Sequence, residues 1–126
     1  MKIEIDLNVD SSNKIDAYSA GCVVIGKKAY KSSLIVSPGG IIENWPPDKF
    51  PDLTCRHMEQ ILSLSPEIVL LGTGLQLCFP ADELLAPFAS RKIGFEVMDT
   101  GAACRSYNFL LGEGRQVAAA LLMIED

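Results

Sequence analysis

The sequence lacks an apolar run long enough to cross a membrane. A membrane-spanning helix needs about 20 mostly apolar residues, and the longest such run, residues 117–124, is far shorter. The amino terminus also lacks the uninterrupted apolar core of a signal peptide, because Lys2, Glu4 and Asp6 place a charge at every second position. These absences predict a soluble protein with no integral membrane segment that stays in the cytoplasm.

Positive charge is also scarce. The 126 residues include 11 lysines and arginines against 16 aspartates and glutamates, which gives a net charge of −5. Binding to nucleic acid through its phosphates needs a basic face that displaces counterions. No segment interleaves lysine or arginine with aromatic residues, which is the usual footprint of such a face. We therefore expect no nucleic-acid partner.

Residues that bind metals or cofactors are few and badly spaced. The chain has a single histidine, His57, and no C-x-x-C motif among its four cysteines, which are Cys22, Cys55, Cys78 and Cys104. Cys55 and His57 lie too close together on a predicted helix to share a metal ion. No phosphate-binding Gly-Lys-Ser/Thr loop is present. The sequence thus predicts four reduced thiols, no metal and no cofactor.

What the sequence does contain is a change of pattern near residue 52. Before it, alternation over residues 2–9 predicts a half-exposed edge strand, and strands 21–26 and 33–36 are expected to form a hairpin closed by Gly26-Lys27-Lys28. After it, helices and strands alternate: a helix capped by Asp52 or Thr54, strand 68–71, a helix from Pro80, strand 94–98, helix 100–111 and strand 115–124. Helical crossovers between strands indicate a largely parallel sheet covered by helices.

Two of these strands end in residues that suit a binding site. Gly72-Thr73-Gly74 follows strand 68–71, and Asp99-Thr100 follows strand 94–98. The carboxyl ends of neighbouring parallel strands are where α/β sheets bind ligands. The glycines form either an anion-binding nest or a tight turn, although a dinucleotide motif would need a third glycine. Asp99 is either an acid–base group or the cap of the next helix, and the cap is favoured because no histidine lies nearby in sequence.

Other reactive side chains lack partners, so no catalytic residues are predicted. Cys104 lies one turn into helix 100–111, where the helix dipole can lower its pKa, but without a histidine partner a buried, inert thiol is favoured. Tyr107 is expected in the core with its hydroxyl bonded, while Asn108 either bonds backbone or faces a partner. Trp45, in a proline-rich loop, either plugs the end of the sheet or forms an exposed binding anchor.

The motifs of the second half resemble the Mth-domain family. They fall in order and at matching spacing, namely Pro66–Gly74, Glu96–Thr100, Ala103-Cys104, Tyr107–Leu110 and Glu113–Arg115. The resemblance implies a three-layer α/β fold around a mixed sheet, so that residues 1–126 form a single Mth-type domain with the β-hairpin at its amino terminus. It brings no settled catalytic residues, because the best-understood members are assembly or interaction proteins, among them an assembly factor of mitochondrial complex I.

The chain departs from the family in the loop after Gly72-Thr73-Gly74. Many relatives have an arginine where this chain has Gln76, and often another basic residue where it has Cys78. Binding of an anion by this loop is therefore expected to be weaker here than in those relatives.

Two functions are compatible with these observations. The first is a non-enzymatic domain that acts through an unidentified protein partner, as in the assembly of a respiratory complex, and association with copies of itself is compatible with that role. The second is a small-molecule or anion-binding protein, or an enzyme, that uses the carboxyl edge of the sheet. The candidate binding surface comprises seven residues: Trp45, Gly72, Thr73, Gly74, Asp99, Thr100 and Arg115.

Overall fold

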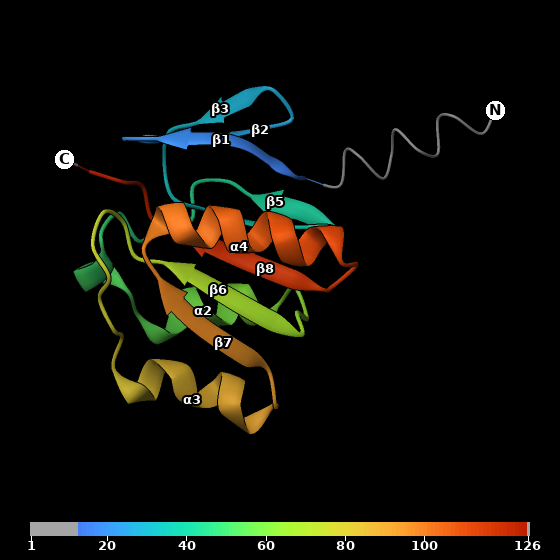
Figure 1. Cartoon of the computed structure of the whole chain (residues 1–126). Coiled ribbons are helices and arrows are strands. Elements are labelled where there is room, and N and C mark those ends of the chain that lie inside the picture. Colours follow the sequence, from blue (N-terminus) through green and yellow to red (C-terminus); the bar gives the residue numbers. More distant parts are fainter. Residues whose placement is uncertain (1–12, 126) are drawn as a thin grey trace.

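The structure is a computed structural model that describes residues 13–125 of the chain. Its elements form a five-stranded sheet with helices on both faces and a small three-stranded sheet beside it (Figure 1). The edge strand predicted over residues 2–9 lies outside the described residues.

The five-stranded sheet is mixed, and its central strands are buried. Its order is β5 (Gly40–Ile42), β4 (Leu34–Ser37), β8 (Val117–Leu121), β6 (Ile68–Gly72) and β7 (Gly94–Met98). β8, β6 and β7 run parallel to one another, while β4 is antiparallel to β8 and β5. Every residue of β8 is buried, as expected for a central strand that is covered on both faces.

Helices cover both faces of this sheet (Figure 1). One layer is α4 (Thr100–Gly112), and the other consists of α2 (Cys55–Leu62) and α3 (Asp82–Ser90). Alternate residues of β6 face the two layers, because Leu70 packs with α4 whereas Val69 and Leu71 pack with α2 and α3. The predicted three-layer α/β fold with a mixed, largely parallel sheet is confirmed.

The amino-terminal hairpin is present, but its second strand is not the one that the sequence predicted. β2 (Cys22–Ile25) pairs antiparallel with β3 (Lys28–Tyr30) on one side and with β1 (Ile15–Ser19) on the other. Gly26 and Lys27 both have positive φ, 60° and 70°, which gives the two-residue turn of a tight hairpin. The segment 33–36 instead supplies β4 next to β8. Its apolar residues are fully buried and need cover on both faces, which an outer hairpin does not provide.

The three-stranded sheet is attached to α4 through two adjacent side chains. The amide of Asn108 accepts from the N–H of Ile15 at 2.9 Å and donates to the carbonyl of Ile15 at 2.7 Å. The Tyr107 hydroxyl donates to the carbonyl of Asn13 at 2.9 Å. Asn108 therefore bonds backbone, and Tyr107 lies in the core with its hydroxyl bonded, as predicted.

Candidate functional site

The ends of β6 and β7 meet at the carboxyl edge of the sheet, as the sequence predicted. The N–H of Thr73 donates to the last carbonyl of β7 at 2.9 Å, and the N–H of Thr100 donates to the carbonyl of Gly74 at 2.9 Å. The cluster unites most of the candidate residues, namely Gly72, Thr73, Gly74, Asp99 and Thr100.

Thr100 is the centre of this cluster. Its hydroxyl donates to the carbonyl of Leu122 at 2.6 Å and accepts from the N–H of Gly74 at 2.8 Å. The side chain is fully buried, and buried polar groups of this kind stabilise a fold only when they are paired. A single hydroxyl thus joins the loop after β6, the start of α4 and the segment after β8.

The N–H groups of the Gly-Thr-Gly turn are already taken by protein acceptors. Those of Thr73 and Gly74 donate to the carbonyl of Met98 and to the hydroxyl of Thr100, whereas an anion-binding nest needs free N–H groups that converge on one point. Gly74 adopts a φ of 96°, which favours glycine. A Cβ at Gly72 would lie 2.9 Å from the Thr100 hydroxyl oxygen. The geometry supports the tight turn.

Asp99 caps α4, as the sequence predicted. Its Oδ1 accepts a hydrogen bond from the N–H of Ala102 at 2.9 Å, and its backbone is extended, as an N-cap residue requires. The cap satisfies one of the N–H groups that the first turn of a helix leaves unpaired.

We predict that Asp99→Ala lowers the free energy of unfolding by about 0.5–2 kcal/mol, since the cap is lost. Asp99→Asn should cost far less, because its amide oxygen still accepts from Ala102. Urea denaturation of the two variants beside the wild type measures both effects. Equal losses in the two variants would show that the carboxylate charge, rather than the cap, stabilises this end of α4.

Trp45 is part of the core and is not an exposed anchor. Its side chain is only 2% exposed and packs beneath the sheet with residues of α2 and α3. The indole N–H donates to the carbonyl of His57 at 3.3 Å. Of the two alternatives for Trp45, a buried position against the sheet and an exposed anchor, the structure shows the buried one. Trp45 is therefore no longer part of the candidate binding surface.

Arg115 lies at the opposite edge of the sheet. Its Nε is 3.0 Å from a carboxylate oxygen of Glu67, which also accepts from the N–H of Gln116 at 2.9 Å. Glu67 and Gln116 immediately precede β6 and β8, so this ion pair joins the amino ends of two parallel strands. The bond from Gln116 and then that from Arg115 hold the pKa of Glu67 below its usual value. Grouping Arg115 with the carboxyl edge was wrong.

His57 is built into the start of α2. Its Nδ1 accepts from the N–H of Thr54 at 3.1 Å, as the third residue of a capping box does, and this bond requires a ring nitrogen without a proton. Burial lowers the pKa of His57, an effect that Asp52 opposes and Arg56 reinforces.

We predict that the protein loses stability as the pH falls from about 6.5, the ordinary pKa of histidine in an unfolded chain, toward the lowered pKa of His57. The unfolded chain takes up the proton first because its histidine keeps a higher pKa, so the free energy of unfolding declines from about pH 7 downward. The variant His57→Gln retains an acceptor for the Thr54 N–H and has nothing to titrate. Its stability, measured by denaturation between about pH 5 and 7.5, should be flat where that of the wild type slopes. Identical slopes would contradict this prediction.

Cys104 is an inert core thiol. It is 1% exposed, and burial raises its pKa to about 12, so the nucleophilic thiolate is suppressed. All four cysteines are unpaired in the described part of the chain, which agrees with the expected reduced thiols.

A loop of exposed apolar side chains, which was not predicted from the sequence, directly follows the Gly-Thr-Gly turn. Leu75, Leu77 and Phe79 are 54%, 50% and 73% exposed. The hydroxyl of Thr73 fixes their backbone, because it donates to the carbonyl of Gln76 at 2.7 Å and accepts from the N–H of Cys78 at 3.2 Å. We call residues 75–79 the apolar loop. The Leu-x-Leu-x-Phe pattern between a glycine and a proline was the signal that could have identified it.

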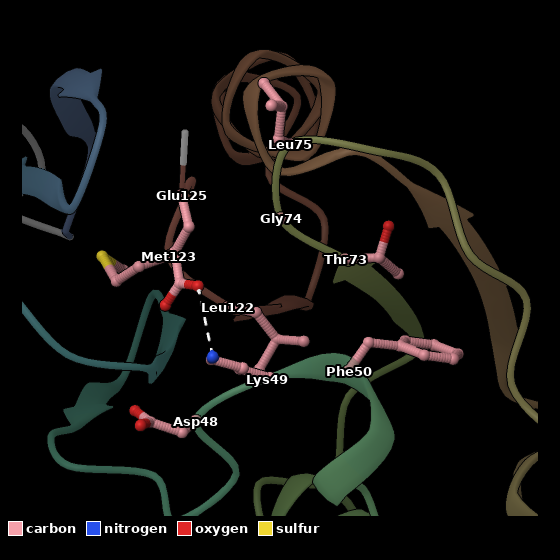
Figure 2. A pocket seen from close by; sticks show the side chains of 9 residues that line it. All are labelled: Asp48, Lys49, Phe50, Thr73, Gly74, Leu75, Leu122, Met123 and Glu125. Atoms are coloured by element: carbon pink, nitrogen blue, oxygen red, sulfur yellow. Dashed lines mark ion pairs between the residues drawn. The ribbon is translucent and has the colours of Figure 1, made fainter.

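A hollow of about 130 Å³ lies at the base of this loop (Figure 2). Its wall is formed by residues 48–50, by residues 73–75, and by Leu122, Met123 and Glu125. Lys49 reaches across to Glu125 at 4.0 Å, and Leu75 points away from this pair (Figure 2). The hollow is too small for most ligands, whose pockets hold roughly 300–1,000 Å³.

Within residues 13–125, no group of three or more histidine, cysteine, aspartate or glutamate residues is placed to hold a metal ion. No helix in the same part of the chain has the length and apolar character needed to cross a membrane.

Known proteins are similar to this chain in sequence and in fold. A family model described as a protein of unknown function, DUF498/DUF598, matches residues 15–122. The chain is 30% identical over 108 residues to the 13 kDa major membrane protein of Francisella tularensis, covering 83% of this chain and 86% of that protein. It is 34% identical over 111 residues to bovine NADH dehydrogenase (ubiquinone) 1 alpha subcomplex assembly factor 3, covering 86% of this chain but only 59% of that protein.

A solved structure gives the same assignment. The solution structure of a Mth938-like domain from Bordetella pertussis matches with a TM-score of 0.82 and 28% identity, covering 92% of this chain and 89% of that one. The predicted membership of the Mth-domain family is thereby confirmed, and the chain belongs to the DUF498/DUF598 family.

Proposed function

We propose that this chain is a protein-interaction domain of the assembly type, which docks a partner protein through its apolar loop. The observation that carries the proposal is the exposure of Leu75, Leu77 and Phe79 within five residues. Leaving large apolar side chains in water forgoes about 1.5–3 kcal/mol for each. Exposed large apolar side chains that lie close together in a chain are candidates for an interaction site, since extended apolar patches on a protein surface mark such sites.

Hydrogen bonds anchor the backbone of the loop at two positions, which favours a preformed conformation and so lowers the cost of binding. Thr73 is 6% exposed, and its hydroxyl bonds the backbone of the loop at Gln76 and Cys78. A loop that is ordered before the encounter loses less conformational entropy on association than a mobile one.

The charges around the loop indicate which charges a partner would carry. Asp82 and Glu83 begin α3 directly after it, and Asp48 and Glu125 line the hollow at its base. Lys49 is the one basic residue of that hollow, and its ammonium group faces Glu125. An apolar loop with an acidic rim fits a partner that presents an apolar groove edged by lysine or arginine.

The bovine relative supports an assembly role, since its name describes it as an assembly factor of NADH dehydrogenase. We propose that the partner is a component or second assembly factor of a membrane-bound respiratory complex. The proposed partner is inferred from a relative of which this chain covers only 59%. The identity of the partner is therefore tested separately from docking through the apolar loop.

The test is a quantitative affinity purification of the tagged chain from its own cells. A partner that docks on the loop is recovered with the wild type and lost with Leu77→Ser/Phe79→Ser. The matched control Gln76→Ser changes an exposed polar residue of the same loop and should retain the partner. Undiminished recovery with the double variant would refute docking through the apolar loop, and a partner outside respiratory complexes would refute the narrower assignment.

Ligand binding at Gly72–Gly74 and Asp99–Thr100 is the less supported alternative, because the N–H groups that would hold an anion are occupied. A thermal-shift screen over nucleotides, phosphates and carboxylates tests it, since a ligand that binds only the folded state raises Tm.

A further inference from the structure

A second apolar feature, a hollow, lies beside α4 at the edge strand β7. It is a shallow hollow of about 450 Å³ that shares no lining residue with the one in Figure 2. Four apolar side chains form its floor and two charged side chains lie among them: Ile68, Leu70, Met98 and Leu110 with Glu96 and Arg105.

The hollow exists because α4 does not reach the edge of the sheet. The helix packs over β6 and β8, and β7 is the outermost strand on that side (Figure 1). Glu96 pairs in register with Leu70, so it lies on the face that α4 covers elsewhere. A charged residue on the inner face of an edge strand disfavours the addition of another strand. The occupant is therefore expected to pack on the face of the sheet.

An exposed aromatic side chain lies at the same hollow. Phe109 is 65% exposed and belongs to α4 one turn after Arg105, so the two side chains project from the same side of the helix. A surface that carries both a projecting aromatic side chain and an apolar hollow can pair with a second copy of itself, because the aromatic side chain of each copy can enter the hollow of the other. Two-fold symmetric dimers have such interfaces, in which residue i contacts residue j and j contacts i.

The charges at the hollow also suit a two-fold symmetric interface. Glu96 and Arg105 have opposite signs, and neither forms an ion pair with any residue among positions 13–125. The polar contact of Arg105 is to the neutral hydroxyl of Tyr18. Two-fold packing that places Arg105 of one copy against Glu96 of the other forms this pair twice.

We propose that this surface is a homodimer interface. Phe109 of each copy fills the hollow of the other, and Arg105 of each copy faces Glu96 of the other. The apolar loop of the proposed function lies outside this interface, so that each half of the dimer keeps a free docking loop.

Sedimentation velocity of the full chain over a range of concentrations tests the proposal. The wild type should be a dimer, and Phe109→Ser should be a monomer. Phe79→Ser, which removes a comparably exposed phenylalanine from the apolar loop, should remain a dimer. A wild type that stays monomeric up to about 1 mM, or a dimer that survives Phe109→Ser, would overturn the interface.

Charge reversal tests the pairing itself. Glu96→Arg and Arg105→Glu each place like charges together and should raise the dissociation constant by about tenfold or more. The double variant restores opposite charges in swapped positions and should recover most of the affinity. A double variant as weak as the single ones would overturn the proposed packing. Circular dichroism confirms folding. The variant Leu77→Ser/Phe79→Ser separates the two proposals because it is expected to lose the partner but not the dimer.

Discussion

Replacing Thr100 by valine is expected to lower the free energy of unfolding by about 2–6 kcal/mol. Valine has nearly the same shape but no hydroxyl, so the N–H of Gly74 and the carbonyl of Leu122 both lose their partner. Both of these hydrogen bonds are buried. A buried polar group left unpaired costs about 1–3 kcal/mol, which explains why an apparently conservative change is so harmful.

The matched control is Thr100→Ser, which keeps the hydroxyl and removes one methyl group. It should cost about 1 kcal/mol, the usual value of a buried methylene-sized group. Chemical denaturation of the three proteins gives both differences. A valine variant no less stable than the serine variant would show that the methyl packing, rather than the two hydrogen bonds, stabilises the carboxyl edge.

Replacing Gly72 by alanine is expected to cost about 2–3 kcal/mol or more. Its new Cβ would lie 2.9 Å from the Thr100 hydroxyl oxygen and 3.0 Å from the Thr100 Cα and from a methyl of Leu121. The backbone of Thr100 cannot move aside easily, because its N–H bonds Gly74 and its hydroxyl bonds two further groups. The strain therefore separates α4 from the ends of β6 and β8.

Gly39→Ala controls for the intrinsic effect of removing a glycine. No atom lies within 4 Å of a Cβ built at Gly39, so alanine there should change stability by less than about 0.5 kcal/mol or increase it slightly. Urea titrations of the two variants measure the contrast. Equal stabilities would mean that the close approach of Thr100 to β6 is easily relaxed.

The sequence was sufficient to predict the elements whose patterns are local. The continuous apolar run of β6 predicts a buried strand, and the cap was the favoured interpretation of Asp99 because no histidine lies nearby in sequence. The structure has both. The meeting of the Gly72–Gly74 turn with Asp99–Thr100 was also predictable, because parallel neighbouring strands end at the same edge.

The remaining errors concern residues whose environment is set by distant parts of the chain. Segment 33–36 has the same apolar pattern whether it pairs with β2 or with β8. The two-residue turn at Gly26-Lys27 pairs β2 with β3 instead, and segment 33–36 pairs with β8, where both of its faces are covered. Trp45 is apolar enough for either a core or an interface, and burial under α2 decides between them. Arg115 lies before the amino end of β8. Because β8 runs parallel to β6, Arg115 lies at the amino edge of the sheet, opposite the carboxyl edge.

The position of β8 has a consequence for synthesis on the ribosome. Among residues 13–125 this strand follows every other strand, yet it lies between β4 and β6 and joins them within the sheet. Until residues 117–121 emerge, β4 with β5 and β6 with β7 remain two separate fragments with apolar edges exposed. The sheet is therefore completed only after translation has passed its last strand, and a nascent chain stalled before that point is a target for chaperones or aggregation.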